Sequence, residues 1–186
     1  MKRPGVLPVG LAAGLLLAAG AYAQLPVRTA SVVNPQVAKP LLSFAVMTDL
    51  EKHLDERINT AGGEEPLVLL GPARALYLAG YGAVVTQEVS LAITPTISPF
   101  RPKITPQDVV RVHQKKVERV PLLKQLIRQM WASTAETLTT VPDNEQIVIA
   151  IRLLYKPWED TNGLPGQILL RGTRGAGVDG VQMEEQ

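Results

Sequence analysis

The chain has 186 residues, a formal net charge of +2 and no cysteine. Without cysteine it has no thiol nucleophile, disulfide or thiolate metal site, so its stability must come from packing. Lys2 and Arg3 account for the excess charge, because removing them from 19 Lys and Arg leaves 17 against 17 Asp and Glu. Net charge therefore gives no reason to expect a nucleic-acid partner.

Residues 1–23 have the pattern of a cleaved signal peptide. A positive start precedes the uncharged apolar run Val6–Ala19, and Ala21–Ala23 supplies the small residues at a cleavage site before Gln24. The uncharged run Pro4–Gln24 is also about long enough to cross a bilayer, so a retained membrane anchor is the alternative. A helix there would be weakened by Pro8, Gly10 and Gly14. We therefore expect an exported protein of bacterial type, periplasmic or secreted.

The rest of the chain divides by composition. Residues 24–40 contain three prolines among small and polar residues and predict a linker. Residues 41–173 are enough for one domain with its own core. Residues 174–186 continue a glycine-rich stretch and end in "MEEQ", a composition typical of a flexible tail.

The first expected element is a helix over 47–59. Apolar residues lie on one face of it, and Thr48 with Glu51 matches a capping box at its start. Two glycines at 62–63 end the pattern.

Two short strands are expected next, at 66–70 and 75–78, separated by a turn at 71–72. From Val85 to Ile93 apolar residues alternate with others, which is the period of a half-buried strand. The glycines before this strand predict a hairpin turn with positive φ, namely Gly80 and Gly82.

A long helical pattern begins at Thr105, an N-cap followed by Pro106, and continues towards Thr140. A straight helix of that length would measure roughly 50 Å, whereas a compact domain of this size is roughly 36 Å across. Pro121 removes a backbone donor, so we expect a kink or break there.

The strongest strand pattern is 145–155, and "QILLRG" at 167–172 is expected to pair back against it. The order of elements predicts an α+β domain: a mainly antiparallel sheet of four to five strands, with two helices on one face, the second long and kinked near Pro121. Helix and hairpin patterns occur twice, which suggests a duplicated unit, although the two halves share no residue-by-residue match.

The two histidines, His53 and His113, lie on different expected helices and have no metal-ligand spacing. We expect no metal, no cofactor and no catalytic residue. The alternative is a hydrolase that uses carboxylates or histidine, and it would require a pocket where such groups converge.

A basic stretch covers 101–128, and an acidic stretch covers 49–65. We expect the basic side chains to form a solvated face, in part opposite the acidic first helix; the alternative is a face for anionic lipid or cell-wall polymer. Eight residues make up the basic set: Arg101, Lys103, Arg111, Lys115, Lys116, Arg119, Lys124 and Arg128.

The loop "YKPWEDTNG" at 155–163 is the candidate ligand site. Its aromatic rings could stack on a sugar or peptide and its acids could accept hydrogen bonds. The candidate set is Tyr81, Trp158, Glu159 and Asp160, with Tyr81 joining from the other hairpin. The structural alternative is that the acids cap a turn in which the glycine at 163 has positive φ.

The sequence thus favours an envelope protein that acts as a non-catalytic binding or interaction module. Its partner would be a protein or a cell-envelope polymer. A hydrolase and a membrane-tethered module with residues 4–23 retained remain the alternatives.

Overall fold

The computed structural model describes residues 42–100 and 102–186, so the expected signal peptide and linker lie outside it. Within this part of the chain, none of the helices combines the length and hydropathy needed to cross a membrane. The elements, in chain order, are α1 (Phe44–Thr60), β1 (Val68–Leu78), β2 (Gly82–Ser90), α2 (Pro106–Thr137), β3 (Gln146–Leu153), β4 (Gln167–Thr173), the 3-10 turns η1 (Arg174–Ala176) and η2 (Val178–Gly180), and β5 (Gln182–Glu185).

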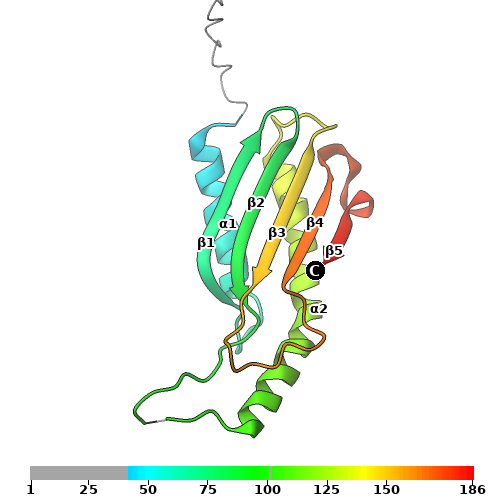
Figure 1. The fold of residues 1–186 in the computed structure, drawn as a ribbon. Helices are drawn as coiled ribbons and strands as arrows, with labels where there is room; N and C mark the ends of the chain where they lie inside the picture. Colours follow the sequence, from blue (N-terminus) through cyan, green and yellow to red (C-terminus); the bar gives the residue numbers. More distant parts are fainter. Residues whose placement is uncertain (1–41, 101) are drawn as a thin grey trace, which may run out of the picture. The chain divides into compact units, whose positions relative to one another are not determined.

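The strands form one five-stranded sheet in the order β1-β2-β3-β4-β5. Only β2 and β3 run parallel, and every other neighbouring pair is antiparallel. The described chain is therefore a helix and an antiparallel hairpin, followed by a second helix and hairpin. Both helices lie on the same face of the sheet, α1 against β1 and α2 against β3 and β4 (Figure 1). The expected α+β fold is confirmed.

The core lies between this face and the helices. Alternate residues of β3, such as Ile147, Ile149 and Ile151, point at the helices and are fully buried. They meet apolar residues such as Leu54 of α1 and Trp131 of α2, which share the same core. The indole Nε1 of Trp131 donates a hydrogen bond to the Ile147 carbonyl at 2.9 Å, so this large side chain is buried with its one donor satisfied.

Helix α1 begins one turn earlier than expected. Its N-cap is Ser43, whose hydroxyl accepts a hydrogen bond from the Val46 N–H at 3.3 Å. The predicted capping residues Thr48 and Glu51 lie inside the helix. Glu51 accepts a hydrogen bond from the Ala75 N–H at 2.8 Å, so its carboxylate binds β1, a long-range contact that the local sequence pattern could not reveal.

The turn expected at Gly71 and Pro72 is wrong, because β1 continues through both residues. The strand accommodates them with register shifts between Leu69 and Gly71 and between Gly71 and Arg74. A proline is tolerated here because β1 is the edge strand and its lost donor breaks no central ladder.

Acidic residues of α1 protect that edge. Asp55 Oδ1 accepts hydrogen bonds from the Ala73 N–H at 2.7 Å and from Gln87 Nε2 at 2.9 Å, and Glu51 binds the Ala75 N–H. Backbone donors of an edge strand that are already bonded cannot pair with another chain.

Helix α2 is 32 residues long and is not interrupted at Pro121. The carbonyl that loses its partner belongs to Val117, a residue that is 44% exposed and so lies on the outer face of the helix, where water can reach the backbone. The expected break at Pro121 is therefore absent. A helix of this length does not have to fit within the width of the domain, because the first turns of α2 extend past the end of the sheet (Figure 1).

Residues 174–186, for which the sequence predicts a flexible tail, form η1, η2 and the edge strand β5. The backbone groups of Gln167 and Gln186 bond each other at 3.0 Å in both directions, and Glu185 forms an ion pair with Lys124 at 2.6 Å. This pairing depends on β4, which a composition argument cannot take into account.

Candidate functional site

The face of the sheet that points away from the helices bears a row of side chains that crosses all five strands. The register pairs Leu76 with Val84, Val84 with Val148, Val148 with Arg171, and Arg171 with Gln182. Paired residues in a sheet project to the same side, so these five share one face. We call this surface the open face.

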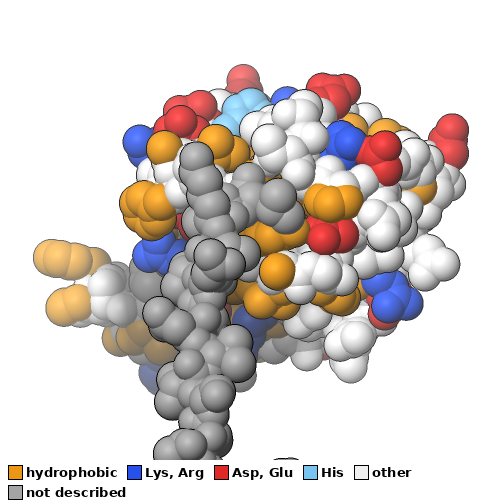
Figure 2. All heavy atoms as spheres, turned by 90° about the horizontal axis from the view of Figure 1, so that it is seen from above, with side chains coloured by type: hydrophobic (Ala, Val, Ile, Leu, Met, Phe, Trp, Pro, Cys, Tyr) orange, Lys and Arg blue, Asp and Glu red, His pale blue; other side chains and the backbone are white. Residues whose placement is uncertain are grey.

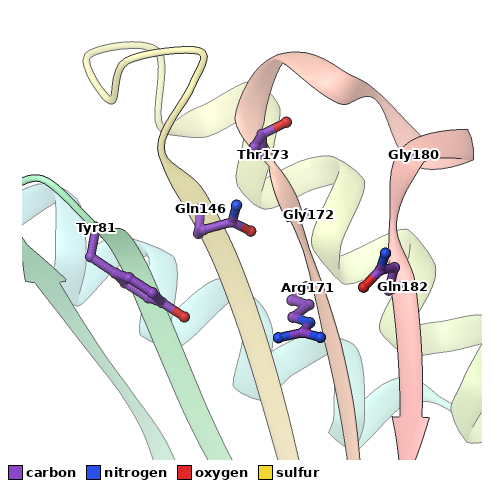
Figure 3. A pocket seen from close by; sticks show the side chains of 7 residues that line it. All are labelled: Tyr81, Gln146, Arg171, Gly172, Thr173, Gly180 and Gln182. Carbon is purple, nitrogen blue, oxygen red and sulfur yellow. The ribbon is translucent and has the colours of Figure 1, made fainter.

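A hollow of about 410 Å³ lies at one end of the open face. Figure 3 shows Tyr81 and Gln146 on one side of it, Gln182 on the other and Arg171 between them. Thr173 and the backbone of two glycines complete the lining. We call it the Tyr81 hollow.

The turn that carries Tyr81 is held by one buried carboxylate. Glu145 accepts hydrogen bonds from the Tyr77 hydroxyl at 2.8 Å and from the Gly80 N–H at 3.2 Å. The Gln146 N–H donates to the Tyr81 carbonyl at 2.7 Å. The glycines have φ of +80° at Gly80 and +130° at Gly82, as the sequence predicts for a hairpin turn. Burial, together with the carboxylate of Glu145, raises the pKa of Tyr77, so its hydroxyl keeps the proton that it donates.

The side chains of the hollow suit hydrogen bonding rather than acid–base chemistry. They comprise one phenol, two amides, one hydroxyl and one guanidinium, and no carboxylate is among them. Arg171 pairs with Glu184 at 2.7 Å, but its side chain is 50% exposed, so other donors of the fork remain accessible. Such a set can bind carbonyl, hydroxyl or carboxylate groups of a partner, with the Tyr81 ring as a stacking surface.

A second hollow of about 410 Å³ lies farther along the same face. Arg74, Glu88 and Arg152 are among its lining residues, and Arg152 approaches Glu88 at 3.7 Å. Because both residues are well exposed, this pair contributes little to stability and leaves both charges accessible. The open face therefore offers polar groups along much of its length.

The loop 155–163 holds a buried ion pair, and it borders a hollow of about 280 Å³ whose lining includes Tyr155, Lys156 and Glu159. The carboxylate of Glu159 pairs with the ammonium of Lys116 on α2, and the two side chains are 2% and 1% exposed. The Lys116 ammonium also lies 4.8 Å from the centre of the Tyr155 ring. Glu159 therefore fixes the loop to α2.

Asp160 is also committed to the loop. Its Oδ1 accepts a hydrogen bond from the Asn162 N–H at 3.0 Å, and its carbonyl lies 3.0 Å from His113 Nδ1. Gly163 has φ of +72°. For Asp160 and Gly163, the structural alternative given by the sequence describes what is seen. Glu159, in contrast, pairs with Lys116 and does not cap the turn. Trp158 is half-buried in the same loop.

The four candidate residues are not brought together. Tyr81 precedes β2, whereas Trp158, Glu159 and Asp160 follow β3, and these strands run parallel from the pair Gly82–Gln146 to the pair Val89–Leu153. At about 3.3 Å per residue the two groups are roughly 25 Å apart along the strands. Only Tyr81 lines the Tyr81 hollow.

The histidines do not share a site. His53 is exposed on α1, His113 lies on α2 against the 155–163 loop, and neither lines the two hollows of the open face. Across residues 42–100 and 102–186, no group of three or more His, Cys, Asp or Glu is arranged to hold a metal ion.

Most of the basic stretch is paired with acids of the fold. Arg101 lies outside the described residues. Five of the others are in ion pairs, two of them with Glu65 from the acidic stretch: Arg111–Asp108, Lys115–Glu65, Lys116–Glu159, Arg119–Glu65 and Lys124–Glu185. Much of this charge therefore joins α2 to other parts of the domain.

Sequence reasoning missed Gln146, Arg171, Thr173 and Gln182 as site residues. Each is an ordinary polar residue at a strand end, and only the strand register shows that they converge. The local signal that was available is that Gln146 and Arg171 lie on the side of each strand opposite to its buried residues.

Comparisons with protein-family models, with curated proteins and with solved structures give no match to this chain.

Proposed function

We propose that the protein is an exported, non-catalytic interaction module that binds a partner protein or a cell-envelope polymer on its open face, at the Tyr81 hollow. The observation that carries the proposal is the arrangement of the sheet. Helices cover one side of it, and on the other side Tyr81, Gln146, Arg171 and Gln182, together with Thr173, converge on one hollow. The pattern of residues 1–23 supports the export.

The chemistry of the hollow favours an extended, polar partner. Amides and a guanidinium bind carbonyl, hydroxyl and carboxylate groups, which recur along peptides and glycans. A chain lying along the open face would meet the Tyr81 hollow at one end and the charges of Arg74, Glu88 and Arg152 farther along. Binding pockets of this kind gain specificity from a few placed polar groups.

Crosslinking in intact cells tests the binding surface. A photoreactive phenylalanine analogue at position 81 is expected to form a discrete crosslinked product, and the same analogue at Lys52, exposed on α1, is not. Arg171→Ala should abolish the product, whereas Arg128→Ala, which removes an exposed arginine of α2, should leave it. Equal crosslinking at positions 81 and 52, or no effect of Arg171→Ala, contradicts the proposal.

Export is tested separately by mass spectrometry of the protein from cell fractions. We expect a mature chain that begins at Gln24 and is found outside the cytoplasm. An intact chain, with Met1 present, in the soluble cytosolic fraction would contradict the export but would leave the crosslinking result standing.

A further inference from the structure

Apolar side chains gather on a part of the domain that extends past the sheet. The segment between β2 and α2 runs outward beside the first turns of α2 (Figure 1). Ile97 and Phe100 on this segment are 63% and 99% exposed, and Val110 in the second turn of α2 is 55% exposed. Seen from above, orange side chains occupy the end of the part that extends to the left (Figure 2). We call Ile97, Phe100, Lys103 and Val110 the arm.

The charge of this region is positive. Between positions 91 and 115 the sequence has four basic residues and a single acid, Asp108. The Asp108 side chain is only 6% exposed and pairs with Arg111, and it accepts hydrogen bonds from the Thr105 backbone at 3.1 Å and hydroxyl at 2.8 Å. The one negative charge of this stretch is thus covered. Arg111 is paired with it and Lys115 is paired with Glu65, while Lys103 is exposed.

The base of the arm, at the start of α2, is fixed in place. Thr105 and Asp108 form a complete capping box that fixes the start of α2. Pro99 and Pro102 each have a fixed φ, which restricts the backbone at those two positions. Below the arm, the Lys116–Glu159 ion pair fixes α2 to the 155–163 loop. Holding an apolar side chain in water costs free energy that packing inside the domain would have avoided.

We propose that the arm binds the surface of an anionic lipid bilayer, with Phe100 and Ile97 entering the interfacial layer and Lys103 lying among the lipid phosphates. Exposed apolar side chains beside basic ones are the combination that anionic bilayers attract, by apolar burial and by charge together. A projecting Phe100 that is 99% exposed suits a fluid surface, which deforms around it, better than a protein, which would need a matching pocket. This surface is distinct from the open face, so the proposal does not depend on the proposed function.

Vesicle co-sedimentation of the full chain, in its native processed form, tests the apolar contribution. With vesicles of phosphatidylglycerol and phosphatidylcholine, Ile97→Ser with Phe100→Ser is expected to lower the partition coefficient at least about tenfold. Leu76→Ser with Leu78→Ser is the matched control, because these side chains are 46% and 48% exposed on the sheet, away from the arm. The control should change binding less than about twofold. Equal losses in the two double variants overturn the proposal.

The charge contribution is tested by Lys103→Glu, with Lys52→Glu on α1 as the control. Lys103→Glu is expected to weaken binding to anionic vesicles by about fivefold or more, and the effect should shrink as salt is raised. The control should have little effect. The same loss on vesicles of phosphatidylcholine alone would contradict a charge-dependent contact.

A local reporter separates the arm from any membrane affinity of residues 1–23. In the otherwise unchanged chain, Phe100→Trp should add fluorescence that shifts to the blue on anionic vesicles and is quenched by lipids carrying a spin label near the head group. If the whole chain binds vesicles while the residue at position 100 stays in water, the proposal is wrong. The exposed side chains of the arm would then have to be explained by a protein partner. Absence of any vesicle binding also overturns it.

Discussion

The two ends of the sheet are each organised by one carboxylate, but in different ways. At the end that bears the Tyr81 hollow, Glu145 accepts hydrogen bonds from uncharged donors, the Tyr77 hydroxyl and the Gly80 N–H. At the other end, Glu159 pairs with the charged Lys116 in a fully covered position. Glu145 supports a turn whose own aromatic side chain, Tyr81, stays accessible. Glu159 fixes a loop to α2 and its carboxylate is not accessible to a ligand.

The difference shows why a loop's composition is a poor guide to its function. The 155–163 loop combines aromatic and acidic residues in the way that ligand loops do, yet its acids stabilise the fold. The turn before β2 has one aromatic and two glycines, and it contributes Tyr81 to the Tyr81 hollow. What decides between a structural and a binding role is whether each polar side chain is already bonded, and the local sequence does not contain that information.

The largest expected effect comes from breaking the ion pair. Lys116→Met should lower the free energy of unfolding by about 3–5 kcal/mol, because it leaves the buried Glu159 without its partner. Urea denaturation followed by circular dichroism measures the change.

The double variant Lys116→Met with Glu159→Met is the control for this prediction. It should recover most of the stability, since replacing both charges with apolar groups removes the unpaired carboxylate. A double variant no more stable than the single one would show that the contacts of Lys116 other than the ion pair determine the cost.

One glycine at each end of the sheet, Gly82 and Gly163, allows the backbone constraints of the two ends to be compared. Gly82→Ala should cost about 3 kcal/mol or more, because φ is +130° and the added Cβ would lie 1.9 Å from the Gln146 carbonyl oxygen at the parallel strand pair. Gly163→Ala has φ of +72° and meets nothing within 4 Å, so about 1 kcal/mol is expected. Thermal unfolding of both variants tests the ranking, and equal losses would contradict a close backbone approach at Gly82.

Much of the fold could be predicted because the spacing of apolar residues along the chain indicates the helices and strands. The face of β3 that contains Ile147 and Ile149, the hairpin glycines and the cap at Thr105 depend on near neighbours in the chain. The errors arise where a distant partner overrides the local signal. β1 passes through Gly71 and Pro72 because α1 and β2 hold it, and the glycine-rich C-terminal segment becomes a strand because β4 offers its edge.

The candidate site could be predicted only at Tyr81. The remaining side chains of the hollow come from strands whose register no single sequence reveals, and a shift of one residue would turn Arg171 into the core. The same limit applies at the other end, because the partner of Glu159 is Lys116, 43 positions away.

A smaller effect is expected from removing the carboxylate at the Tyr81 end. Glu145→Ala should lower the free energy of unfolding by about 1–3 kcal/mol, because the Tyr77 hydroxyl and the Gly80 N–H lose their acceptor. It should also reduce crosslinking from position 81 by loosening the turn. Urea denaturation and the crosslinking assay measure the two effects. Full crosslinking in this variant would show that Glu145 does not position Tyr81.

The smallest expected effect separates the two ends by pH. Burial, with a contribution from the Glu159 carboxylate, raises the pKa of Tyr155 from 10.0 to about 12, and its hydroxyl donates to the Pro165 carbonyl at 2.7 Å. Between these values the folded state holds a proton that the unfolded state has released, so the free energy of unfolding falls as the pH rises from about 10 to about 12. Tyr155→Phe removes the titrating hydroxyl while Lys116 and Glu159 remain. Lysine deprotonation affects the variant and the parent chain alike, so the difference between their pH dependences of unfolding free energy reports on Tyr155. We expect the variant to be somewhat less stable at neutral pH, through the lost hydrogen bond, and to lose stability less steeply above pH 10. Urea denaturation at a series of pH values gives both slopes. Parallel slopes would mean that Tyr155 titrates alike in the folded and unfolded chains, so that the Glu159 end does not bury this hydroxyl as the structure shows.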